Sequence, residues 1–260
     1  MAIAALIFDL DETLITDDDA TKKALRQTAK HAQKQYDIDA ERLWRTAYTH
    51  AKQMWQASST FSFCESLGIS ASEGLWGRFE NSGPQWQKLH DWVPGYQVEA
   101  WEHALAAQGH PDCALAEQLA TIFRAARRTS QAIFPETERI LSQLCATYKL
   151  GILTNGAPDL QREKIAYNGL AHYFDAIVVS GEVGVGKPDP AVFNAVLKQL
   201  AVPAHMTLMV GDSLERDMLG ASRSGLKGVW VNRSGHPGNH QYASLLHAEI
   251  ATLDELYKVL

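Results

Sequence analysis

The second half of the chain alternates between segments of helix-forming composition and short apolar runs that predict buried strands. The predicted helices span Glu136–Thr147, Asp159–Asn168, Pro190–Leu200 and Glu215–Ser224, and the predicted strands span Leu150–Thr154, Ala176–Val179, Thr207–Val210 and Gly228–Val231. Strands that are joined through helices at this spacing form crossover units, in which neighbouring strands run parallel. The alternation therefore predicts a parallel sheet with helices on both faces.

The beginning of the chain adds one strand to this sheet. Ala2–Phe8 is a continuous apolar run, which is typical of a strand buried on both faces. Helical patterns dominate the stretch that follows, over Lys22–Tyr36, Ala40–Ala57, Tyr96–Ala107 and Ala114–Arg128. The economical interpretation is a doubly wound α/β core, residues 1–16 and 133–260, with an all-helical domain, residues 17–132, inserted after its first strand.

Composition excludes several classes of function. The 260 residues carry a net charge of -6, and no basic patch outweighs this acidic background, which argues against nucleic-acid binding. The longest apolar runs are too short to cross a bilayer and no secretory signal precedes the first strand, so we expect a cytoplasmic protein with no membrane partner. The 3 cysteines are widely scattered, which predicts neither a disulfide framework nor a zinc site.

Polar side chains follow four of the predicted strands, at the point where each strand ends. They are Asp9, Asp11 and Thr13 after the first, Thr154 and Asn155 after the second, Lys187 after the third, and Asp212, Ser213 and Asp217 after the fourth. Ligands bind beyond the carboxyl ends of parallel strands, so we expect these side chains to gather at one edge of the sheet. Each segment alone is explained by a turn or a helix cap. Together they crowd carboxylates that repel one another unless a cation lies among them, so the set predicts a site for a hard divalent ion.

The same segments resemble a known family. Asp9–Thr13, Thr154–Gly156, Gly186–Pro190 and Gly211–Ser213 with Asp217 resemble, in order, the four sequence motifs of the haloacid dehalogenase-like hydrolase superfamily. The helical insert is similar to the cap of its helical-cap phosphatases, a branch that includes phosphoserine phosphatases, 5'-nucleotidases and sugar-phosphate phosphatases. The resemblance implies a Rossmann-like core. The dehalogenases of the superfamily lack the second aspartate and need no metal, so Asp11 favours a phosphatase.

The resemblance also implies roles for these residues. Asp9 would attack phosphorus, and Asp11 would protonate the departing oxygen and later activate water. Thr154 and Asn155 would bind phosphoryl oxygens. Lys187 would bind the phosphate as well and offset charge between it and Asp9. These roles agree with the physics of phosphoryl transfer, which depends on positioning and charge stabilisation.

The resemblance implies magnesium as the cofactor. Mg²⁺ would be held by Asp9, the backbone carbonyl of Asp11, and Asp212. Asp217, Thr13 and Ser213 would act from outside its ligand sphere, Asp217 through water or by orienting Lys187. For Thr13 two interpretations stay open, because its hydroxyl could orient Asp9 or could satisfy the turn.

We therefore predict a monomer or weak homodimer that hydrolyses a small phosphorylated metabolite of the phosphoserine, nucleotide or sugar-phosphate type through an aspartyl-phosphate. One alternative is a phosphosugar mutase, which would pass the phosphoryl group to another hydroxyl. A less favoured alternative is a binding module without catalysis.

Two groups of residues in the insert are predicted to be structural. Most of its tryptophans should form its core, because large aromatic side chains usually serve burial first: Trp44, Trp55, Trp76, Trp86, Trp92 and Trp101. Most of Arg124, Arg127 and Arg128 should lie on a solvated face.

Overall fold

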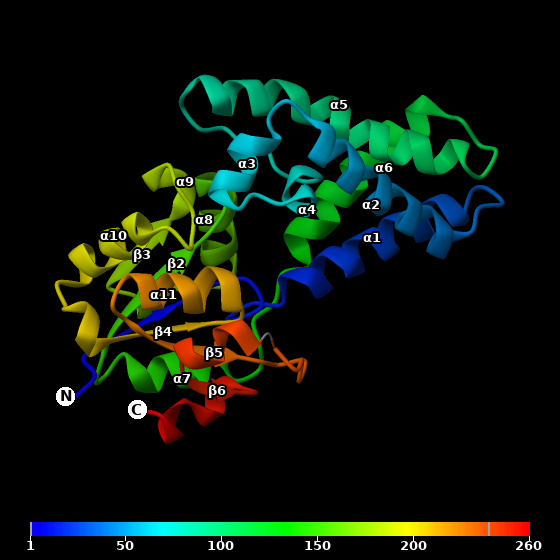
Figure 1. The fold of residues 1–260 in the computed structure, drawn as a ribbon. Coiled ribbons are helices and arrows are strands. Elements are labelled where there is room, and N and C mark those ends of the chain that lie inside the picture. Colours follow the sequence, from blue (N-terminus) through cyan, green and yellow to red (C-terminus); the bar gives the residue numbers. More distant parts are fainter. Residues whose placement is uncertain (1, 239) are drawn as a thin grey trace. The chain divides into compact units, whose positions relative to one another are not determined.

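The computed structural model describes residues 2–238 and 240–260 (Figure 1). The chain divides into two compact units, which we call the core unit, Met1–Thr16 with Ala132–Leu260, and the helical unit, Asp17–Gln131. Among the described residues, no helix combines the length and the apolar character needed to span a bilayer.

The core unit is built on a sheet of six strands. In spatial order they are β3 (Ala176–Val179), β2 (Lys149–Thr154), β1 (Ala5–Phe8), β4 (Thr207–Gly211), β5 (Lys227–Val231) and β6 (Leu246–Ile250). Every neighbouring pair is parallel, which confirms the predicted doubly wound α/β fold. From β1 the chain moves outward to β3 on one side and then from β4 to β6 on the other. The strand order therefore reverses between β1 and β4.

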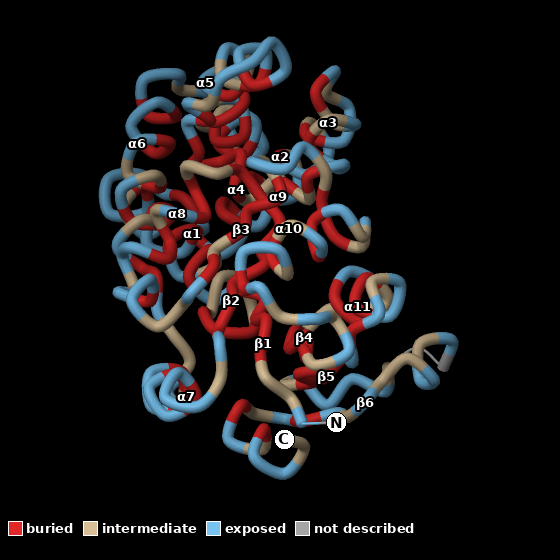
Figure 2. The backbone as a smooth tube through the Cα atoms, turned by 90° about the vertical axis from the view of Figure 1, so that its left-hand side faces the viewer, coloured by how far each residue is buried: buried red, intermediate tan, exposed pale blue. Residues whose placement is uncertain are grey.

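Strand β1 is buried along its whole length (Figure 2), because its side chains are apolar on both faces of the sheet. Leu6 and Phe8 belong to one apolar cluster, and Ala5 and Ile7 belong to a second cluster on the opposite face. The helices that contribute to the first cluster are α7 (Thr137–Leu144) and α8 (Pro158–Tyr167), and those of the second are α10 (Pro190–Leu200) and α11 (Leu219–Arg223). Helices thus cover both faces of the sheet.

Two elements of the core unit differ from the prediction. Strand β6 was not predicted, because its side chains are mostly half-buried or exposed and leave no continuous apolar run. The last predicted helix begins with a π-helical turn, Leu214–Met218, in which the Ser213 hydroxyl accepts a hydrogen bond from the Arg216 backbone N–H. The short elements that complete this unit are α9 (Ser180–Val183) and 3-10 helices over Ala171–Tyr173, Ala204–Met206, His240–Leu245 and Leu253–Lys258.

The helical unit contains α1 (Asp17–Gln33), α2 (Ala40–Ala57), α3 (Phe61–Leu67), α4 (Ala71–Gly74), α5 (Pro84–Ala106) and α6 (Cys113–Thr129). Asp39 and Asp112 cap α2 and α6, each accepting a hydrogen bond from a backbone N–H of the first turn. The predicted start of α5 at Tyr96 is wrong, because the helix continues through Pro94 from Pro84. Proline removes one backbone donor but need not end a helix.

The tryptophan prediction is confirmed for five side chains, since Trp44, Trp55, Trp76, Trp86 and Trp101 are buried. Arg127 does not lie on a solvated face, since its side chain is 1% exposed. Its guanidinium pairs with the Asp17 carboxylate and donates to the Thr21 hydroxyl, so contacts with α1 offset the cost of burying the charge.

Candidate active site

The predicted site residues lie at the carboxyl ends of the central strands. Asp9 directly follows β1, Thr154 ends β2, and Asp212 directly follows β4. Asp9 and Asp212 therefore flank the point where the strand order reverses, which is where sheets of this kind bind ligands. Lys187 joins them from the loop between α9 and α10.

Lys187 lies between two carboxylates. Its Nζ is 2.5 Å from Asp9 Oδ1 and 2.6 Å from Asp217 Oδ1, and the side chain is almost fully buried. Burial alone would lower the pKa of Lys187, but attraction to Asp217 and Asp9 outweighs it and raises the pKa. The ammonium is therefore a permanent positive charge beside the nucleophile candidate.

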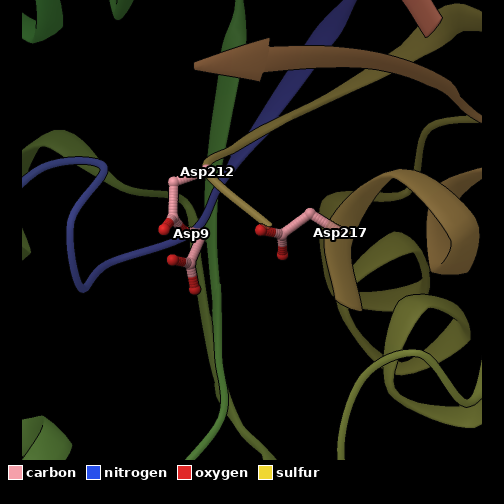
Figure 3. A group of neighbouring side chains, drawn as sticks. All are labelled: Asp9, Asp212 and Asp217. Atoms are coloured by element: carbon pink, nitrogen blue, oxygen red, sulfur yellow. The ribbon is translucent and has the colours of Figure 1, made fainter. Parts of the chain in front are cut away.

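Three carboxylates crowd together here, those of Asp9, Asp212 and Asp217 (Figure 3). Each contributes an oxygen, and these oxygens lie within 4.8 Å of one another. Burial, and then repulsion from Asp9 and Asp217, raises the pKa of Asp212 to about 8. Burial also raises the pKa of Asp9. Attraction to Lys187 acts in the opposite direction, and repulsion from Asp217 raises the pKa further. The ammonium of Lys187 alone does not balance this negative charge, so the donor set fits a divalent cation.

The three carboxylates differ in the hydrogen bonds that they already make with the protein. Asp217 Oδ1 accepts from Lys187, and its Oδ2 accepts from the Ser213 backbone N–H at 3.0 Å. The carboxylate of Asp212 makes no hydrogen bond with any residue that the structure describes. Asp212, together with Asp9, which contacts Lys187 through one oxygen, is thus the better ligand candidate, while both oxygens of Asp217 are bound by Lys187 and by the turn that begins at Ser213.

Asn155 makes contacts that the sequence did not predict. Its side-chain Nδ2 donates to the Lys187 backbone carbonyl at 3.1 Å, and its Oδ1 accepts from the Lys187 backbone N–H at 2.7 Å. The Asn155 amide therefore ties the end of β2 to the loop that carries Lys187. Thr154 lies beside it, and its hydroxyl makes a long 3.4 Å hydrogen bond to the Asn155 carbonyl.

Sequence reasoning missed two contacts of Asp11. Lys164 and Gln161, both on α8, donate to the Asp11 carboxylate at 3.0 Å, and both side chains are fully buried. The available signal was their spacing of three residues, which places a lysine and a glutamine on one face of the predicted helix. That spacing does not reveal which acidic residue they meet.

Thr13 and the residues beyond Asp212 complete the surroundings. The Thr13 hydroxyl is buried, and among the residues that the structure describes it has no hydrogen-bond partner. The Thr13 carbonyl accepts from Arg233, whose guanidinium also pairs with Glu136. Next to Asp212 lies a cavity of about 560 Å³, lined among others by Glu12, Arg233, His236 and Tyr242. The core unit thus offers space for a small molecule beside the carboxylates.

Comparisons with known proteins agree with this geometry. Residues 3–225 match the model of the haloacid dehalogenase-like hydrolase family. The chain is 34% identical over 233 residues to the phosphoserine phosphatase of Thermus thermophilus, covering 89% of this chain and 90% of that protein. It is 28% identical over 236 residues to the N-acylneuraminate-9-phosphatase of Rattus norvegicus, covering 90% and 84%. In fold it resembles the magnesium-bound HAD-hydrolase YfnB of Bacillus subtilis, with a TM-score of 0.68, 23% identity and coverage of 100% and 99%.

Proposed function

The chain belongs to the haloacid dehalogenase-like hydrolase family and is a phosphoric monoester hydrolase, and we propose that it acts through a covalent aspartyl-phosphate at Asp9. The observation that carries this proposal is the placement of Asp9 at the reversal of strand order. There it contacts the Lys187 ammonium and lies next to Asp212. A nucleophile, a fixed cation and a further carboxylate for a metal are the parts that phosphoryl transfer needs.

In the first step, an oxygen of Asp9 attacks phosphorus as the bond to the leaving oxygen breaks. Asp11 gives its proton to that oxygen, which departs as an alcohol. In the second step, water attacks phosphorus and gives a proton to Asp11, the Asp9–phosphorus bond breaks, and inorganic phosphate leaves. Lys187 offsets the negative charge of Asp9 and of the transferring group throughout, with Thr154 and Asn155 beside the phosphoryl oxygens.

Magnesium would be held by the carboxylates of Asp9 and Asp212 and by the backbone carbonyl of Asp11. When bound, the ion supplies positive charge that neutralises the phosphoryl oxygens. Asp217 would act from outside the ligand sphere, because its two oxygens already bind Lys187 and the Ser213 N–H.

For the substrate, we propose a small soluble phosphate monoester that carries an amino-acid or sugar group. The names of the relatives support this, since one is a phosphoserine phosphatase and another an N-acylneuraminate-9-phosphatase. Residues 17–132 would serve as a cap that selects the leaving group and keeps bulk water away from the aspartyl-phosphate. We propose that the protein acts as a monomer or weak homodimer.

The test is phosphate release from a panel of phosphorylated metabolites by the wild type and by Asp9→Asn, with magnesium and with chelator. We expect release that requires both Asp9 and magnesium. Release that survives Asp9→Asn would exclude Asp9 as the nucleophile. Isomerised sugar phosphate without phosphate release would instead identify a mutase, and no turnover of any substrate would favour a binding module.

A further inference from the structure

We propose that Lys164 and Gln161 are positioning residues that hold the carboxylate of Asp11 for both steps of the reaction, an inference that rests on the proposed function. Lys164 and Asp11 are 153 positions apart in the chain, yet they meet beside the end of β1. No role for either α8 residue followed from the sequence motifs.

Hydrogen bonds from the side chains of Lys164 and Gln161 fix the carboxylate of Asp11. Lys164 Nζ lies 3.0 Å from both Oδ1 and Oδ2, and Gln161 Nε2 lies 3.0 Å from Oδ2. Donors that engage both oxygens define the plane of the carboxylate as well as its position, which a single contact would not do. Asp11 is therefore oriented by the core unit itself.

Gln161 also connects Asp11 to the rest of the site. Its Nε2 donates to the Asn155 backbone carbonyl at 2.6 Å, and the Asn155 side chain binds the backbone of Lys187. The Lys187 ammonium in turn contacts Asp9. A continuous series of contacts thus connects Asp11, the candidate acid and base, to Asp9, the candidate nucleophile. The relative positions of these two carboxylates decide the rates of both steps. A displacement of about 1 Å between such groups can cost about 10²-fold in rate.

Burial distinguishes this ion pair from an ordinary one on the same helix. The Lys164 side chain is 0% exposed and that of Asp11 is 29% exposed. Arg162 pairs with Glu182 from the same helix, but these side chains are 50% and 33% exposed. A buried ammonium is costly, and contact with a carboxylate offsets that cost, whereas an exposed pair contributes little. Arg162 therefore offers a matched control outside the site.

Lys164→Met removes the ammonium and keeps most of the side-chain volume. With p-nitrophenyl phosphate the leaving group departs without needing a proton, so phosphorylation of Asp9 depends little on Asp11. Hydrolysis of the aspartyl-phosphate still requires Asp11 to take a proton from water. We therefore expect the second step alone to slow, by about 10²-fold.

The experiment is rapid-mixing kinetics of the wild type and the variants with magnesium. Lys164→Met should release about one equivalent of p-nitrophenol per active site at the wild-type rate of phosphorylation, followed by turnover about 10²-fold below wild type. Lys164→Arg should recover most of the lost turnover, and Arg162→Met should match the wild type. In an Asp11→Asn background, Lys164→Met should change turnover by less than about 2-fold, because its effect acts through Asp11.

Two results would overturn the inference while leaving the proposed function intact. One is unchanged turnover in Lys164→Met, and the other is a loss of turnover without a burst, which is what a merely unfolded fraction would give. A wild type that releases no phosphate from any substrate would overturn both proposals together.

Discussion

Replacing Lys187 with methionine removes the cation that separates two buried carboxylates and leaves the apolar stem in place. The ammonium is 2.5 Å from Asp9 Oδ1 and 2.6 Å from Asp217 Oδ1. Removing one partner of a buried ion pair costs about 3–5 kcal/mol, because the other charge stays buried without compensation. Both carboxylates lose the same partner here. We therefore expect the free energy of unfolding of the core unit to fall by about 4 kcal/mol in chelator.

Magnesium should recover part of this loss, because a cation held by Asp9 and Asp212 replaces some of the missing positive charge. Ligands that bind only the folded state stabilise it, so the difference between magnesium and chelator should be larger in Lys187→Met than in the wild type. Both quantities can be measured by urea denaturation followed by circular dichroism.

The control is Lys198→Met, which removes an exposed lysine from α10 and should change stability by less than about 0.5 kcal/mol. A loss below about 1 kcal/mol for Lys187→Met in chelator would refute the reasoning, because it would mean that the buried carboxylates do not depend on the ammonium.

Two further predictions concern backbone space and acid stability. Gly211→Ala would place a Cβ 2.3 Å from Asp217 Oδ2, so Asp217 must move. We therefore expect the kcat for phosphate release to fall at least about 10-fold. Wild-type kinetics in this variant would contradict the close contact. Its control, Gly95→Ala in α5, meets no atom within 4 Å and should raise the free energy of unfolding by about 0.5–1 kcal/mol. Burial alone would raise the pKa of Glu136, but the hydrogen bond from Arg233, hydrogen bonds from backbone N–H groups and attraction to Arg233 together outweigh it and lower the pKa below its usual 4.5. As the pH falls, the Glu136 carboxylate therefore becomes protonated in the unfolded chain before it does so in the folded protein. The stability that Glu136 contributes is complete above pH 4.5 and is lost as the pH falls through the pKa of the folded state. Urea unfolding between about pH 7 and pH 3 should show a smaller acid loss in Glu136→Gln than in the wild type, and parallel curves would contradict this account.

The parts of the fold that could be predicted are those whose signal is local. Strands β1 and β4 are apolar on both faces, so composition alone identifies them as central strands of a parallel sheet. Strand β6 lies at the edge with half-buried and exposed side chains, and nothing in its composition separates it from a loop. The first half of α5 was missed for a similar reason, since Pro94 resembles a break in sequence and is tolerated within the helix.

The sequence by itself determined which side chains lie at the ends of the central strands. A polar residue that directly follows a buried apolar strand must lie at the edge of the sheet, where that strand ends. Asp9 and Asp212 were identifiable in this way. Only the tertiary structure decided which cations meet which carboxylates. Lys164 reaches Asp11 across 153 positions and Arg127 reaches Asp17 across 110. Such pairs depend on how whole helices pack, and the burial that makes them necessary exists only after the chain has folded.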